Sequence, residues 1–115
     1  MDSAAESIHV RRHLLEILDA AAGRVRHPGD DNSTYVAEAL LQSQLALRGF
    51  PMPLERMRKE LYWLYERGKT RDRDSGYVHF KRTKVGREEY FRWRISDLGR
   101  DVLEGARDDA SVASA

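Results

Sequence analysis

The stretch Tyr77–Ile95, YVHFKRTKVGREEYFRWRI, decides the fold because apolar and polar side chains alternate along it with a period of two. Alternation over 77–82 and again over 89–95 is typical of strands that bury one face. Residues 83–87 join the two runs, and Gly86 suits a tight turn. The stretch therefore predicts a β-hairpin, and its apolar face consists of Val78, Phe80, Phe91, Trp93 and Ile95.

Upstream of the hairpin the apolar residues recur at three- and four-residue steps, which is the period of an amphipathic helix. This pattern predicts three helices, at residues 7–22, 34–48 and 53–67. The third has the clearest apolar stripe, formed by Leu54, Met57, Leu61 and Leu64.

The predicted helix 34–48 has an unusually wide apolar face. Val36, Leu40 and Leu47 form its main apolar line, while Leu41 and Leu45 lie to one side of that line. Two interpretations remain open: the helix is buried on two sides, or part of its surface contacts a second protomer.

A last short helix is expected at 98–104, with Ser96 or Asp97 as its cap and Gly105 as its end. Residues 106–115 are small, polar and acidic, and composition predicts a disordered tail there.

The length of 115 residues fits one domain, which we place at residues 7–105 with a disordered N-terminus at 1–6. The chain has no cysteine, so disulfides, Cys-based zinc sites and thiol catalysis are excluded. No apolar run approaches the roughly 20 residues that span a bilayer, and the first residues do not have a signal-peptide pattern. We expect a soluble, cytoplasmic protein without a membrane partner.

The net charge of +1 hides a strong asymmetry along the chain. Residues 48–100 carry fifteen basic and eight acidic side chains, whereas residues 1–47 carry four basic and seven acidic. Residues 101–115 carry one basic and four acidic side chains. A basic block between acidic ends is typical of a protein with one surface facing a polyanion, although a solvated basic surface without a partner would have the same composition.

The order helix, helix, turn, helix, hairpin, helix predicts an α+β domain in which a three-helix core covers the hairpin's apolar face. The segments Leu54–Gly68 and ISDLGRDVL at 95–103 resemble the corresponding parts of winged-helix (helix-turn-helix) transcription regulators. The stretch LLQSQLALRGFPMPLERMRKELYWLYERG at 40–68 is similar to small uncharacterised winged-helix proteins of Mu-like phages and prophages. The resemblance implies a winged helix-turn-helix with a C-terminal β-hairpin wing and a short final helix.

The same resemblance implies a DNA-binding protein, expected to be a phage or prophage transcriptional regulator. In a helix-turn-helix, residues near the start of the second helix reach base edges in the major groove, and the wing adds phosphate contacts. The candidate duplex-DNA contacts are Arg56, Arg58, Lys59 and Tyr62 on the helix, and Lys81, Arg82, Lys84, Arg87, Arg92 and Arg94 on the wing. Each of these has an alternative role as an ordinary solvated or packing side chain.

The rival hypothesis is a protein-interaction or phage-assembly module with the same fold. The acidic first half and the wide apolar face of helix 34–48 favour it, and acidic residues that interrupt the helix–wing surface would favour it further. A homodimer is plausible because palindromic DNA sites require paired helices. We find no nucleophile–base constellation and expect no enzymatic activity and no cofactor. His9 and His13 lie one helical turn apart but have no third ligand at an obvious spacing, so we expect no metal site.

Overall fold

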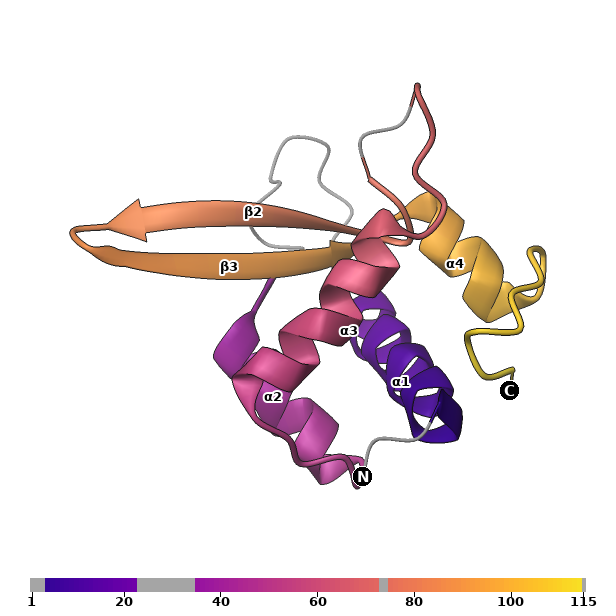
Figure 1. Ribbon diagram of the computed structural model, residues 1–115, viewed down its shortest axis with the longest axis horizontal. Coiled ribbons are helices and arrows are strands. Elements are labelled where there is room, and N and C mark those ends of the chain that lie inside the picture. Colours follow the sequence, from indigo (N-terminus) through magenta and orange to yellow (C-terminus); the bar gives the residue numbers. More distant parts are fainter. Residues whose placement is uncertain (1–3, 23–34, 73–74, 115) are drawn as a thin grey trace.

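A computed structural model describes residues 4–22, 35–72 and 75–114, and within these ranges the fold is α+β (Figure 1). The described residues form four helices and a three-stranded antiparallel sheet. In chain order these are α1 (Ala4–Ala22), β1 (Val36–Ala37), α2 (Glu38–Leu47), α3 (Leu54–Glu66), β2 (Val78–Val85), β3 (Glu88–Ile95) and α4 (Asp97–Glu104).

The predicted hairpin is present and is longer than the alternation indicated. β2 and β3 pair in antiparallel register from Val78↔Ile95 out to Val85↔Glu88. A two-residue turn joins the strands, and Gly86 at its first position has a φ of +63°, a conformation that glycine adopts without strain. Figure 1 shows the far end of the hairpin extending well beyond the helices.

The third strand was not predicted. Val36 and Ala37 pair with Trp93 and Arg92 of β3, which gives the sheet order β1-β3-β2. The sequence prediction of a helix from residue 34 is therefore wrong for these two positions. Val36 is buried, and as a β-branched residue it packs well at the edge of a sheet.

The prediction for the apolar face of α2 is also wrong. Leu41 and Leu45 are fully buried, whereas Leu40 is 55% exposed and Leu47 is 80% exposed. The sequence predicts a helix from residue 34, which would include Val36 in the apolar stripe of that helix. In the structure Val36 belongs to β1, and α2 starts only at Glu38. Without Val36, the stripe that faces the core is Leu41 and Leu45, four residues apart.

The core lies between the helices and one face of the sheet. The α3 stripe is confirmed, since Met57, Leu61 and Leu64 have no exposed surface and Leu54 packs at the edge. Trp93 of β3 is the largest fully buried side chain. The other buried apolar side chains are Val10, Leu14, Leu15, Ile17, Leu18, Ala22, Val36, Leu41, Leu45, Met52, Tyr77, Val78, Ile95, Val102 and Val112.

The caps of α4 are as predicted. The Ser96 hydroxyl accepts a hydrogen bond from the Gly99 N–H at 3.1 Å, and Gly105 ends the helix with a φ of +80°. At the other end of the chain, α1 begins at Ala4, so the described residues 4–6 are helical rather than disordered.

The predicted disordered tail differs most from the structure. Residues 106–114 lie against α1 and α4, where Val112 is buried and the Ala113 N–H donates to the Ile8 carbonyl at 2.9 Å. Asp109 accepts hydrogen bonds from Arg67 at 2.9 Å and from the Tyr77 hydroxyl at 2.5 Å. Composition did not reveal these contacts because a single valine and a single aspartate supply most of them.

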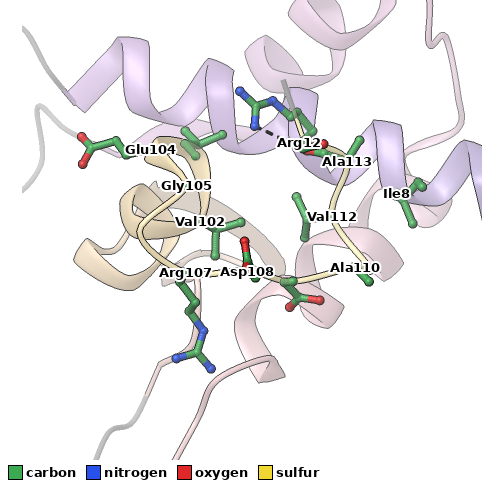
Figure 2. A pocket seen from close by; sticks show the side chains of 13 residues that line it. Ile8, Arg12, Val102, Glu104, Gly105, Arg107, Asp108, Ala110, Val112 and Ala113 are labelled. Atoms are coloured by element: carbon green, nitrogen blue, oxygen red, sulfur yellow. Dashed lines mark hydrogen bonds between the residues drawn. The ribbon is translucent and has the colours of Figure 1, made fainter.

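Between the tail and the helices lies an open cavity of about 560 Å³ (Figure 2). Ile8, Val102 and Val112 form part of its apolar lining, and Arg12 borders it with a hydrogen bond to the Ala113 carbonyl at 3.4 Å. Among all the described residues, no helix has the length and apolar character needed to cross a membrane.

Candidate nucleic-acid interface

The solvent-facing side of α3 is more acidic than basic. Glu55, Lys59, Tyr62 and Glu66 are its exposed residues, spaced three or four apart along one face. This face therefore presents one cation and two carboxylates. Of the four DNA contacts predicted on this helix, two are exposed in the structure, Lys59 and Tyr62.

Arg56 lies against α1 rather than on the solvent face. Its guanidinium Nη1 donates to Glu6 Oε1 at 3.0 Å, and its side chain is 19% exposed. This ion pair ties the start of α3 to the start of α1, and it does not aim the arginine at an external ligand.

Arg58 is held by a carboxylate in the interior. Its Nε and Nη2 donate to both oxygens of Glu38 at 2.6 to 3.1 Å, and its guanidinium lies 4.9 Å from the Phe91 ring centre. The Trp93 indole N–H donates to the same carboxylate at 3.2 Å. The hydrogen bond to Glu38 raises the pKa of Arg58 above its usual value. Together these contacts join α2, α3 and β3, so the role of Arg58 in the structure is to hold these elements together.

Tyr62 packs on the hairpin although it is 39% exposed. Its ring meets the Trp93 and Phe80 rings edge-on, with centroids 5.5 and 6.0 Å apart. Such edge-to-face pairs stabilise the contact between helix and sheet. Tyr62 therefore couples α3 to the hairpin, and part of its ring remains accessible.

The hairpin has two faces, which the strand register defines. The inner face, on the side of α3, carries the buried residues Val78, Trp93 and Ile95 near the helices and Arg82 and Lys84 farther out. The outer face carries Lys81, Arg92 and Arg94, together with His79, Thr83, Val85, Glu88 and Tyr90. The six basic hairpin residues predicted to contact DNA are therefore divided between the two faces, and one of them, Arg87, lies in the turn.

The cations toward the end of the hairpin are accessible. Arg82, Lys84, Arg87 and Arg92 are exposed, and within the described ranges none of them makes an ion pair. Lys84 does lie opposite Glu89 in the register. Over Val78–Ile95 the hairpin carries six basic and two acidic side chains, so it has a clear positive excess.

Tyr35 immediately precedes β1, and the sequence pattern alone did not mark it as part of this surface. Its ring centre lies 4.7 Å from Lys81 Nζ and 5.8 Å from the Arg94 guanidinium. The short strand β1 brings Tyr35 to the outer face, and only recognition of that strand would have revealed the contact. Cations held over an aromatic ring in this way lose rotamer freedom but keep their charge.

His79 borders the same outer face. Its Nδ1 lies 2.6 Å from the Ser75 hydroxyl oxygen. Burial lowers the pKa of His79, and the nearby positive charge of Arg94 lowers it further. The imidazole therefore favours its neutral form and adds little positive charge to this face at neutral pH.

Within the part of the chain that the structure describes, no group of three or more His, Asp or Glu residues is arranged to hold a metal ion. Comparisons of this chain with protein-family models, with curated proteins and with solved structures find no match.

Proposed function

We propose that this protein is a winged-helix-type domain that binds duplex DNA chiefly through the β2–β3 hairpin. The element order α1, α2, α3, hairpin is the one that the sequence resemblance implies, and β1 pairs with β3 so that the hairpin is anchored to the helices. A role as a phage or prophage transcriptional regulator rests on that resemblance alone.

The observation that carries the proposal is the charge of the projecting hairpin. Arg82 and Lys84 on the inner face and Arg87 in the turn lie on a part of the molecule that extends away from the core (Figure 1). Lys59 of α3 is on the same side, because its neighbour Tyr62 packs against the inner face. These four cations can meet phosphates of one duplex, and phosphate contacts dominate affinity.

The proposal differs from the sequence hypothesis in the role of α3. Arg56 and Arg58 pair with Glu6 and Glu38, and Glu55 on the exposed face opposes phosphate. We therefore expect strong salt dependence with little sequence preference, since the two arginines of α3, the helix predicted to reach base edges, are engaged with carboxylates.

The test is a salt titration of duplex binding by fluorescence anisotropy. Replacing Arg82, Lys84 and Arg87 together by Ala should weaken binding by about tenfold or more in low salt and make the dependence of log K on log salt shallower by about 2 to 3. The matched control replaces Arg48, Lys69 and Arg71, three basic residues outside the hairpin, and should change affinity by about twofold or less.

Two results would reject the proposal: wild-type protein that shows no salt-sensitive duplex binding, or equal losses in the two triple variants. Replacing Arg56, Arg58 and Lys59 together is a poor test, because the first two hold α3 to α1 and α2. A loss of binding in that variant would report unfolding as readily as lost contacts.

A second candidate is a protein-binding module of the same fold. Leu40 and Leu47, the two exposed leucines of α2, favour it, as do the carboxylates on α3. This candidate predicts that the hairpin triple variant still binds the partner protein fully. It also predicts that replacing Leu40 and Leu47 abolishes binding of that partner.

A further inference from the structure

The outer face of the hairpin holds three cations in one patch. Lys81 lies directly opposite Arg92 in the strand register, and Arg94 follows Arg92 on the same face of β3. A patch that gathers basic side chains on one face of a sheet favours the approach of an anionic ligand.

The same face holds two tyrosines, one at each end of the patch. Tyr90 lies two residues before Arg92, is 49% exposed, and among the described residues its ring contacts no other ring and no cation. Its hydroxyl donates to the Glu88 carboxylate, which raises the pKa of Tyr90 and fixes the ring's orientation. Tyr35 at the other end packs with Lys81 and Arg94.

This surface is separate from the one proposed for duplex DNA. Side chains on successive strand residues point to opposite faces, so Lys81 and Arg92 face away from Arg82 and Lys84. A duplex lying against α3 and the inner face would leave the outer patch uncovered. The outer patch therefore has its own ligand chemistry, which does not depend on the proposed function.

We propose that the outer face of the sheet binds single-stranded nucleic acid. A base stacks on the Tyr90 ring while Arg92 and Lys81 contact the phosphates beside it, and Arg94 extends the basic path toward Tyr35. Aromatic rings next to a basic track are the general means of binding single strands, because every unpaired base has an exposed face to stack. Bases within a duplex are stacked on one another and cannot use the tyrosine.

The first experiment measures anisotropy of a fluorescein-labelled oligothymidine of about 15 nucleotides, a length within the usual single-strand site sizes. The Lys81→Ala/Arg92→Ala variant should bind about tenfold more weakly than wild type. The matched control, Arg48→Ala/Arg71→Ala, loses the same charge from outside the hairpin and should stay within about twofold. Equal losses in both variants, or no binding by wild type, would overturn the proposal.

The second experiment separates stacking from charge. Tyr90→Leu should weaken binding by about fivefold or more, while Tyr90→Phe, which keeps the ring, should bind within about twofold of wild type. An abasic oligonucleotide of equal length and charge should bind more weakly than oligothymidine. If the abasic strand binds as tightly, or if Phe and Leu behave alike, the tyrosine is not a stacking platform and the proposal fails.

Two further arms identify the ligand. Comparing oligouridine with oligothymidine of the same length shows whether the protein binds RNA or DNA. Binding of either strand supports the proposal, and failure of both to bind rejects it. Excess unlabelled duplex should leave the labelled strand bound, since the two surfaces are on opposite faces. Displacement by duplex would show one shared surface and would overturn the separate site, whereas loss of duplex binding alone would reject only the duplex proposal.

Discussion

Arg58 shows most clearly why residue type alone does not identify a binding residue. An arginine near the start of a helix in a helix-turn-helix is well placed to read DNA, but here its guanidinium meets both oxygens of Glu38. The Glu38 side chain is 8% exposed, and that of Arg58 is 32% exposed. A carboxylate so buried requires charged or hydrogen-bonding partners, and Arg58 and Trp93 supply them.

Removing Arg58 should therefore reduce stability. We expect Arg58→Ala to lower the free energy of unfolding by about 2 kcal/mol, less than for a fully buried pair because part of the guanidinium is solvated. Urea unfolding at neutral pH measures the change, and Arg82→Ala, an exposed arginine on the hairpin, serves as the control with a loss of about 0.5 kcal/mol or less.

A double-mutant cycle with Glu38→Gln makes the test specific. The loss in the double variant should be smaller than the sum of the two single losses by about 1 kcal/mol or more, because each single change leaves the other group unpaired. An additive result, or an Arg58→Ala variant as stable as Arg82→Ala, would contradict the structural role.

At the scale of elements, sequence periodicity predicted α3, the hairpin and α4 well. Each has a strong local signal: the Met57–Leu61–Leu64 stripe, the alternation around Trp93, or the Ser96 cap. Periodicity did not predict β1, because only two residues form that strand. Strand β1 is Val36 and Ala37 alone, which is too short to show a period, and its existence depends on β3, more than fifty residues away.

The C-terminal tail is the second element that local pattern could not predict. Its order depends on Asp109, whose side chain is 3% exposed and which receives hydrogen bonds from Arg67, Tyr77 and the Ser111 N–H. Burial alone would raise the pKa of Asp109, but these hydrogen bonds and the charge of Arg67 together outweigh it and lower the pKa below the usual 3.8.

This lowered pKa predicts a pH dependence. Because the folded-state pKa lies below the unfolded one, the stabilisation is fully present above about 3.8 and is lost as the pH falls through the folded value. Asp109→Asn should thus reduce stability by about 1 to 3 kcal/mol at pH 7, and its difference from wild type should shrink in acid.

Thermal unfolding from pH 7 to pH 2.5 or so measures this trend. Asp108→Asn is the matched control, since Asp108 is the adjacent, exposed aspartate and should have little effect. If the Asp109→Asn difference stays constant down to the acid limit, the carboxylate is not responsible for holding the tail.

At the scale of the whole molecule, the sequence predicted an α+β fold and a basic hairpin, but not how the charges are distributed in space. The excess of positive charge in residues 48–100 includes Arg56 and Arg58, whose partners Glu6 and Glu38 come from the acidic first part of the chain. Ion pairs with these distant carboxylates neutralise the charges of Arg56 and Arg58. Four exposed cations that make no ion pair with any described residue, Arg82, Lys84, Arg87 and Arg92, lie on the hairpin, and for this reason we propose the interface there.

The most direct test of this account is an amide chemical-shift titration of the ¹⁵N-labelled protein with a short mixed-sequence duplex in low salt. The account predicts that shifts concentrate at Arg82, Lys84 and Arg87 with a smaller effect at Lys59, that Leu40 and Leu47 stay unchanged, and that added salt reverses the shifts. Shifts centred on α2, or no shifts at any protein concentration that NMR can use, would contradict the central claim that the hairpin binds DNA.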